Sequence, residues 1–297
     1  MRAQLLLREE VADSVAARLN APPRADTFVR PSARGGTAVR KRDRGAVPLD
    51  IIVCIKRTPD TEARVRVADG GTSIDPSGVK YIVSPYDEFA LEAALKTREG
   101  AGTGEVVALT LGDGGSAEQL RAALAMGADR AVLLVGEVTM DGLATAKALV
   151  HELRGSSAPL ILFGVKAVDD DQQQVGPMVA TLLGRPCVTS VADFKVGDGR
   201  ASCHREVEGG VEVVEVELPA VLTITKGAFE PRYASLKGIM AAKKKPLEQK
   251  PAQVADTRLH VTAFEAPPER PAGRIVGEGP DAAAPLVRLL REEAKVL

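Results

Sequence analysis

The sequence predicts an α/β protein in which a mostly parallel sheet is flanked by helices and followed by an extended C-terminal arm. From Leu49 onward, short runs of β-branched apolar residues alternate with helical patterns, as they do in parallel strands joined by crossover helices. The chain has 297 residues, which is enough for one large domain and an appendage. The segment after residue 245 is rich in proline and has few residues that could bury themselves, so we expect it to dock on another subunit.

Composition excludes several classes of protein. Hydrophobic residues make up 45% of the chain and charged residues 27%, which is typical of a soluble globular protein. The cysteines Cys54, Cys187 and Cys203 are too widely spaced for a disulfide framework or a thiolate zinc site. Apolar runs such as 220–224 fall far short of the roughly 18 residues of a membrane helix. Residues 48–297 carry more acidic than basic side chains and few aromatic ones, so nucleic acid is not an expected partner.

Residues 1–47 differ from the rest of the chain. They contain one weakly amphipathic stretch, at 5–19, followed by a run rich in proline, arginine and glycine. We predict a mostly disordered N-terminal extension. An arginine-rich leader is also a feature of mitochondrial transit peptides, but the five acidic residues and the lack of a serine bias weaken that interpretation.

The main domain, residues 48–226, begins with alternating elements. β-Branched runs predict strands, and an apolar stripe at helical spacing predicts helices. Asp69-Gly70-Gly71 predicts the turn of an inserted hairpin, and Ser116 with Gln119 forms a capping box for the second helix. In order, the elements are a strand at 50–55, a hairpin of 64–67 with 79–83, a helix at 86–97, a strand at 105–111, a helix from 116, a strand at 131–135, a helix at 143–153, a strand at 159–163 and a helix at 172–183.

Beyond Gly184 the pattern changes to strands alone, because apolar residues alternate or run continuously over short segments. The second part of the chain, 227–297, starts within a distinctive loop, continues as the proline-rich arm and ends in a helix. The expected elements are strands at 187–192, 201–206, 211–217 and 221–225, the loop at 226–245 and the helix at 283–295.

Candidate ligand-binding residues follow from the fold class. Open parallel sheets bind ligands beyond the carboxyl ends of their strands, which here directs attention to the loops 54–57, 111–116 and 164–176. The second loop is glycine-rich but matches neither a P-loop nor a GxGxxG fingerprint. The third packs three carboxylates and three amides before a helix. It is either an acidic first turn that stabilises the helix dipole or a cradle for ribose and phosphate. A magnesium site would need a second acidic cluster, and none is evident.

Nucleophilic catalysis finds little support in the sequence. His151, His204 and His260 fall on a helix, in a strand region and in the tail, so no Ser-His-Asp or Cys-His set is indicated. Cys54, at a strand end, fits a small buried residue beside a ligand better than a thiolate. We therefore expect a carrier or binding protein and not an enzyme.

Several motifs together resemble one family, the β subunit of electron transfer flavoprotein. The resemblance covers residues 48–297 and implies the nucleotide-binding fold of that family, which is similar to adenine-nucleotide alpha-hydrolases. The run Glu-Pro-Arg-Tyr-Ala-Ser-Leu at 230–236 is its most specific part. The matching segments are Ile51–Arg57, Ser84–Ala90, Leu120–Arg130, Leu218–Val221, Phe229–Leu236, Ile239–Met240 and Lys243–Lys245.

The resemblance implies a heterodimer with an α subunit, FAD held mainly by that partner, and a structural AMP in this chain. Tyr86 is expected near the flavin at the subunit junction, and this subunit would do no bond-making chemistry. The AMP-binding residues carried over by position are Cys54, Ser84, Pro85, Tyr86, Asp87, Leu111, Gly164, Val165, Lys166, Ala167, Val168, Asp169, Asp170, Asp171, Gln172, Gln173, Gln174 and Val175.

The resemblance also implies a recognition loop at 230–245 that docks partner proteins, with Leu236 as its apolar anchor. The residues expected to dock are Glu230, Pro231, Arg232, Tyr233 and Leu236. Electron donors would be acyl-CoA dehydrogenases of fatty acid oxidation and related enzymes, and the acceptor an ETF-quinone oxidoreductase or a similar protein. The implied location is the bacterial cytoplasm, or the mitochondrial matrix if the source is eukaryotic.

One departure from the family pattern bears on the cofactor. The bifurcating branch carries a second FAD in place of AMP and usually reads Asp-Gly-Asp where this chain reads Asp169-Asp170-Asp171. A side chain at 170 would crowd that FAD, so AMP is the prediction, although 174–177 resembles the bifurcating branch. A stand-alone adenine-nucleotide-binding protein is a further alternative, as is a scaffold with a vestigial pocket. ATP-using enzymes of this fold carry SGGxDS or HxGH loops, which the chain lacks.

Overall fold

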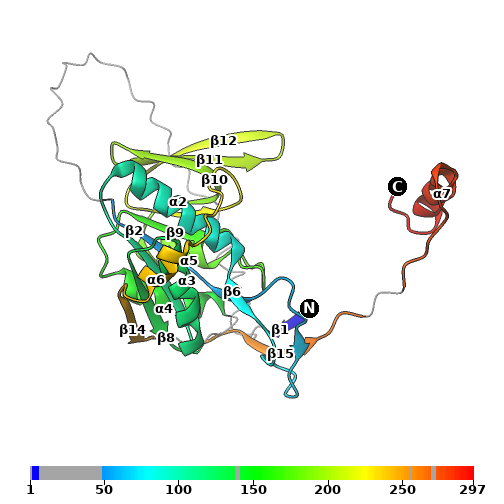
Figure 1. Cartoon of the computed structure of the whole chain (residues 1–297), viewed down its shortest axis with the longest axis horizontal. Helices are drawn as coiled ribbons and strands as arrows, with labels where there is room; N and C mark the ends of the chain where they lie inside the picture. Colours follow the sequence, from blue (N-terminus) through cyan, green and yellow to red (C-terminus); the bar gives the residue numbers. More distant parts are fainter. Residues whose placement is uncertain (1, 7–48, 138–140, 254–255, 269–271) are drawn as a thin grey trace, which may run out of the picture. The chain divides into compact units, whose positions relative to one another are not determined.

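The computed structural model describes residues 2–6, 49–137, 141–253, 256–268 and 272–297 (Figure 1). These form two compact units, one comprising Ala3–Phe264 and one containing Glu265–Leu297. Strand β1, Arg2–Leu6, pairs with β15, His260–Glu265. The rest of the predicted extension 1–47, including most of the amphipathic stretch 5–19, lies outside the described residues and stays a prediction.

A nine-stranded sheet forms the centre of the main unit, and its strand order is β12-β11-β10-β13-β9-β2-β7-β8-β14. The seven strands from β10 to β14 are parallel to their neighbours, and only β11 and β12 are antiparallel. The predicted mostly parallel sheet is thereby confirmed. Its strands are β2 Ile51–Cys54, β7 Val106–Gly112, β8 Arg130–Val135, β9 Leu160–Gly164, β10 Cys187–Gly197, β11 Arg200–Val207, β12 Gly210–Glu217, β13 Ala220–Ile224 and β14 Leu247–Pro251.

Helices cover both faces of this sheet. Helices α2, Pro85–Ala101, and α3, Ala117–Met126, pack into one apolar core, while α4, Gly142–Leu153, and α5, Val175–Leu183, pack into another on the opposite face. The central strands are buried on both sides, which is why their sequences read as continuous apolar runs without polar alternation. The predicted flanking helices are confirmed, with their ends shifted by a few residues.

The chain reverses direction across the sheet at β2. It runs outward from β2 to β7 and β8, then returns so that β9 pairs with the other side of β2. The connections on the two sides of β2 therefore run away from each other. This divergence opens a crevice at the carboxyl ends of β2 and β9, where open α/β sheets place their ligands.

The predicted hairpin of 64–67 with 79–83 is wrong in its pairing. Arg66–Val67 (β4) pairs with Ile74–Asp75 (β5), whereas Tyr81–Val83 (β6) pairs with Arg57–Pro59 (β3). Val83 and Thr58 are buried in this second pair. The strand Tyr81–Val83 thus returns to the base of the insertion, next to the core, and leaves a short hairpin without buried residues at its tip.

Two helix starts also differ from prediction. Ser116 ends a 3-10 turn, Gly114–Ser116, and its backbone N–H is bonded by the Asp113 carboxylate at 3.2 Å. Gln119 does not cap the helix, because its amide donates to the Tyr81 carbonyl at 3.1 Å. The helix predicted from 172 begins only at Val175, since Gln173 has a left-handed backbone with φ of 56°.

The region after β13 contains two elements that the sequence did not predict. The predicted loop 226–245 includes helix α6, Leu236–Ala242, and Leu247–Pro251 joins the edge of the sheet as β14. The sequence of β14 lacks an apolar alternation because its side chains are mostly exposed at that edge. In the second unit, helix α7 spans Ala283–Glu292 after a 3-10 turn at Pro280–Ala282. Among the described residues, no helix has the length and apolar character to cross a membrane.

Candidate functional site

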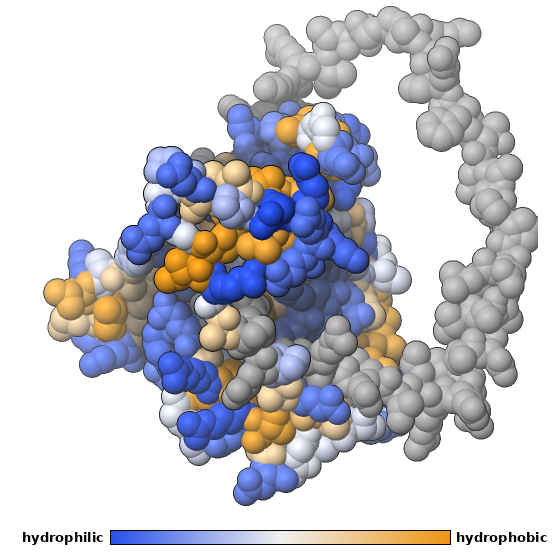
Figure 2. Space-filling view, turned by 90° about the vertical axis from the view of Figure 1, so that its right-hand side faces the viewer, coloured by the Kyte–Doolittle hydropathy of each residue, from blue (hydrophilic) through white to orange (hydrophobic). Residues whose placement is uncertain are grey.

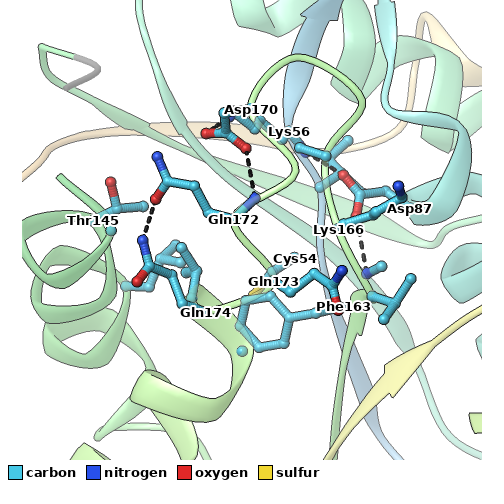
Figure 3. Close-up of a pocket in the computed structure, with 18 of the residues that line it drawn as sticks. Cys54, Lys56, Asp87, Thr145, Phe163, Lys166, Asp170, Gln172, Gln173 and Gln174 are labelled. Atoms are coloured by element: carbon cyan, nitrogen blue, oxygen red, sulfur yellow. Dashed lines mark hydrogen bonds and ion pairs between the residues drawn. The ribbon is translucent and has the colours of Figure 1, made fainter. Parts of the chain in front are cut away.

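A cavity lies at the crevice between β2 and β9, with α4 and the loop before α5 forming its other walls (Figure 3). Most of the predicted nucleotide-binding residues line it, although they come from four separate parts of the sequence. Those residues are Cys54, Asp87, Leu111, Gly164, Val165, Lys166, Ala167, Asp170, Gln172, Gln173, Gln174 and Val175.

Asp87, in the first turn of α2, joins the two strands beneath the cavity. Its carboxylate accepts the backbone N–H of Lys56 at 2.7 Å and that of Gly164 at 2.9 Å. Burial raises the pKa of Asp87 from 3.8 to about 7, against the opposing effect of these hydrogen bonds and of the Lys56 charge. The position of Gly164 requires glycine, because a β-carbon there would lie 2.7 Å from the carbonyl carbon of Tyr86. The end of β9 and the start of α2 are therefore in direct contact.

Lys56 closes the cavity from the end of β2. Its Nζ lies 2.9 Å from a carboxylate oxygen of Asp169 and 2.8 Å from one of Asp170. Burial alone would lower the pKa of Lys56, but the two carboxylates outweigh it and the net shift is upward. The ammonium group is therefore charged at neutral pH and holds the acidic loop against the strand.

The loop between β9 and α5 has an unusual backbone. Asp171 and Gln173 both have left-handed conformations, with φ of 52° and 56°. Non-glycine residues in this region are uncommon and concentrate at functional sites. Gln172 contacts Gln174 through their side-chain amides, and Lys166 pairs with Asp171 at 3.0 Å. The loop thus directs several amide groups toward the cavity, just ahead of the N-terminus of α5.

The remaining wall is apolar. Cys54 and Phe163 lie at the ends of the two central strands, and Leu111, Leu149 and Val175 complete the lining. Burial, with a smaller effect from the Asp87 charge, raises the pKa of the Cys54 thiol, so it is not a thiolate. A cavity with one apolar wall, a lysine and an amide-rich loop at a helix N-terminus suits a ligand with a planar ring, hydroxyl groups and an anionic end.

Other predicted nucleotide-binding residues do not line the cavity. Ser84 and Pro85 begin α2, and half-buried Tyr86 lies with its ring 5.7 Å from Nζ of Lys166. Val168 is half-buried in the loop. Asp169 and Asp171 act through their ion pairs with the two lysines.

The cavity also contains residues outside the predicted nucleotide-binding set. Ile55, Lys56 and Gly176 belong to the loops 54–57 and 164–176 that the fold class indicates, whereas Gly142, Thr145, Leu149 and Phe163 were not predicted. Thr145 and Gly142 belong to the first turn of α4, which the buried side chain of Asp141 caps by accepting the N–H groups of Leu143 at 2.9 Å and Ala144 at 3.1 Å. Aspartate before a helical pattern is a recognised cap signal, so this start was open to prediction.

The residues predicted to dock partners lie away from this cavity. Glu230, Pro231, Arg232 and Tyr233 line a groove beside α2, α3 and α6, and Leu236 begins α6 with 83% of its surface exposed. Figure 2 shows one face of the molecule, on which apolar residues gather in patches among hydrophilic ones. We call residues 230–245 the docking segment.

Within the described ranges, no group of three or more His, Cys, Asp and Glu is placed to hold a metal ion. The three carboxylates of 169–171 lie close in sequence, but Asp169 and Asp170 pair with Lys56, and Asp171 pairs with Lys166. The fold and the cavity together define an α/β protein with a crevice at the switch point of a parallel sheet.

Comparison with known proteins identifies the family. A sequence model described as the electron transfer flavoprotein domain matches residues 72–255. The β subunit of the electron transfer flavoprotein of Syntrophomonas wolfei is 39% identical over 80% of this chain and 93% of that protein. The corresponding β subunit of Bacillus subtilis is 38% identical over 84% and 100%, and that of Homo sapiens 34% identical over 82% and 98%. The chain belongs to the electron transfer flavoprotein β subunit family.

Proposed function

We propose that this chain is the non-catalytic partner in an electron transfer flavoprotein, in which it keeps AMP in the cavity and supports a flavin-binding α subunit. The observation that carries the proposal is the convergence of the family's nucleotide-binding positions on one crevice. Twelve of these positions, drawn from 54, 87, 111 and the stretch 164–175, line the cavity where the sheet changes direction. Such convergence is expected of a ligand site, since packing alone does not require these residue types together.

The residues of the cavity are compatible with an adenylate. The apolar wall of Cys54, Phe163 and Leu149 would accept the adenine ring, and Gln172 and Thr145 offer groups for ribose hydroxyls. The N-terminus of α5 would face the phosphate, because backbone N–H groups and the helix dipole favour an anion there. Lys56 and Lys166 also line the cavity, but both pair with carboxylates of 169–171, so the attraction for an anion comes from the helix N-terminus. AMP so held would be structural, with no reacting group of this chain beside it.

The α subunit is the proposed partner for the second unit of this chain. Helix α7 has no buried residue, although it carries large apolar side chains: Leu286 is 43% exposed and Val287 is 42% exposed. An amphipathic helix without its own core fits a helix that packs on another subunit.

FAD, when bound mainly by the α subunit, would carry electrons from a dehydrogenase to an acceptor. The contribution of this chain would be to buttress that flavin domain, with Tyr86 near the junction, and to present the docking segment. Acyl-CoA and related dehydrogenases are the proposed donors, and an ETF-quinone oxidoreductase or a similar protein is the proposed acceptor. Short-lived contacts with small interfaces suit a shuttle between several partners. We infer a bacterial cytoplasmic location, or the mitochondrial matrix in a eukaryote.

A second FAD in the AMP position is the alternative, and residues 174–177 favour it. The ion pair between Asp170 and Lys56, at 2.8 Å, argues for AMP because it keeps the Asp170 side chain at the cavity wall. Glycine at this position would remove that side chain and its ion pair, and would leave room for a larger dinucleotide.

Nucleotide content tests the proposal directly. The chain is co-expressed with its α subunit, and the purified complex is denatured so that released nucleotides can be separated and quantified. We expect one FAD and one AMP per complex. Two FAD would contradict the AMP assignment and favour the bifurcating type. A complex without any nucleotide would support a scaffold with a vestigial pocket, and a chain that binds adenylate but never associates with the α subunit would support the stand-alone alternative.

A further inference from the structure

The docking segment presents large apolar side chains to solvent. Tyr233 is 99% exposed, Leu236 83% and Met240 70%. These residues lie within eight positions of one another, at and just before α6. Exposed apolar groups that cluster in this way mark interaction sites, and their affinity depends on how well the segment is held before binding.

Arg232 fixes one end of the segment to α2. Its guanidinium donates to Glu92 at 2.7 and 2.9 Å and to Glu99 at 2.7 and 3.0 Å. The Glu92 side chain is only 2% exposed, and the backbone N–H of Arg232 donates to it as well, at 3.3 Å. Hydrogen bonds with Glu99 and Glu92 raise the pKa of Arg232. A planar guanidinium can hold two carboxylates in this manner, which a lysine ammonium group cannot reproduce.

The other end of the segment is fixed to α3. Arg121 donates to the carbonyl oxygens of Ala242 at 2.6 Å and Lys245 at 2.9 Å, and so caps the C-terminus of α6. Lys245 in turn donates to the carbonyl oxygens of Leu124 and Ala128, at 3.0 and 2.6 Å. The segment is therefore tied at both ends, with its apolar side chains between the ties.

We propose that Arg232 is a positioning residue, which sets the geometry of Tyr233 and Leu236 through its bonds with Glu92 and Glu99 and does not itself contact the partner. The inference rests on the proposed docking function of the segment. Tyr233 directly follows Arg232 in the chain, so the guanidinium fork fixes the backbone from which that exposed ring projects. Holding the segment before the encounter lowers the conformational entropy lost on docking.

The role of Glu99 separates positioning from direct contact. If Arg232 acts through its carboxylate partners, Glu99→Gln weakens docking in the same direction as Arg232→Gln. If Arg232 instead contacts an acidic partner, Glu99→Gln leaves Arg232 free and docking is unchanged or stronger. Glu99 is suitable for this test because its side chain is 48% exposed, whereas a change at buried Glu92 could prevent folding.

The experiment uses the complete αβ complex as the electron-accepting substrate of a purified acyl-CoA dehydrogenase. The variants are Arg232→Gln, Arg232→Lys and Glu99→Gln, with Leu236→Ala to report docking itself. Arg205→Gln is the matched control, since it removes one arginine from a partly exposed ion pair with Glu212 on β11 and β12, at the opposite edge of the sheet from β14. The readouts are KM for the complex, kcat at saturation, FAD content, and the rate of tryptic cleavage at Lys237.

We expect Arg232→Gln and Glu99→Gln each to raise KM by about threefold to tenfold, with kcat and FAD content unchanged and faster cleavage at Lys237. Arg232→Lys should give an intermediate KM, and Arg205→Gln should match the unaltered complex. A rise in KM for Arg232→Gln but not Glu99→Gln, or a loss of FAD along with the rise, would overturn the inference. If only Leu236→Ala raises KM, docking stands and positioning by Arg232 fails. If Leu236→Ala has no effect either, the docking function itself fails.

Discussion

Asp87 brings together parts of the chain that are far apart in the sequence. It lies in α2, accepts hydrogen bonds from the ends of β2 and β9, and is 6% exposed. The charged groups that act on its pKa are Lys56 and Asp169, and the Cys54 thiol beside it is neutral. Few solvent molecules can stabilise a charge at this position, so burial dominates and the folded protein binds a proton there that the unfolded chain releases.

The raised pKa of Asp87 predicts a pH-dependent loss of stability. Because its folded-state pKa of about 7 exceeds its ordinary 3.8, the stabilising effect of its proton is complete below about pH 4 and is lost as the pH rises to about 7. We therefore expect the difference in thermal unfolding midpoint between Asp87→Asn and the unaltered protein to shift in favour of the variant as the pH rises from 5 to 8. The corresponding change in the relative free energy of unfolding should be a few kcal/mol at most, since one pKa unit is worth roughly 1.4 kcal/mol.

The measurement compares thermal unfolding by circular dichroism at several pH values between 5 and 8. Glu118→Gln, which removes an exposed carboxylate from α3, is the charge-matched control and should parallel the unaltered protein. Asparagine offers only one good acceptor to the N–H groups of Lys56 and Gly164, so the variant should lose the same amount of stability at every pH. The predicted pH-dependent difference is added to this constant loss. Parallel curves for Asp87→Asn and the unaltered protein would contradict the raised pKa.

At the scale of elements, the start of helix α4 connects the cavity wall to residues 258–259. Its cap residue, Asp141, is 2% exposed and accepts from the first N–H groups of the helix with one oxygen. The other oxygen accepts the N–H of Arg258 at 2.6 Å and that of Leu259 at 3.2 Å. Burial would raise the pKa of Asp141, but these backbone hydrogen bonds outweigh it and the net shift is downward. One carboxylate therefore fixes both the wall that carries Thr145 and the chain that leads to β15.

Replacement of Asp141 should destabilise the start of α4 and residues 256–260 together. We expect Asp141→Ala to cost about 1 to 2 kcal/mol for the helix cap and to increase hydrogen exchange at 141–150 and 256–260. Asp141→Asn keeps one good acceptor oxygen, so it should preserve protection in one of the two segments better than alanine does. Hydrogen exchange followed by mass spectrometry measures both peptides in one experiment. Increased exchange in α4 with none at 256–260 would show that this carboxylate does not hold the C-terminal segment.

At the scale of the whole molecule, the two compact units differ in how much apolar surface they bury. The described part of the main unit has a core on each face of its sheet, whereas α7 contributes no buried residue. The large apolar side chains Ile275, Val296 and Leu297 are 85%, 68% and 67% exposed. A unit of this kind gains little stability from its own packing, so the free energy that orders it would come from a partner.

Removal of residues 266–297 should therefore abolish association without unfolding the main unit. We expect the truncated chain to retain its circular dichroism spectrum and a thermal midpoint within a few degrees of the full chain, because the deletion removes no residue of either core. Co-purification with the α subunit should be lost or reduced by at least about tenfold in affinity. Full retention of the complex would place the main contact with the α subunit elsewhere on this chain.

The sequence by itself determined the fold class and pointed to loops whose residues line the cavity. Continuous apolar strands such as 51–54 and 160–164 can only be satisfied by burial on both faces, and that requirement is local enough to be read from the residues. The motif at 230–236 was equally local, and the family comparison agrees with it.

Only the tertiary structure decided which side chains meet. The pairing of β6 with β3 and the edge strand β14 both depend on contacts with distant residues. The same is true of Lys56 against Asp170 and of Arg232 against Glu92, pairs separated by 114 and 140 positions. A charged side chain gives no sequence signal of its partner, because the energy of the pair depends on separation and burial in space and not on spacing along the chain.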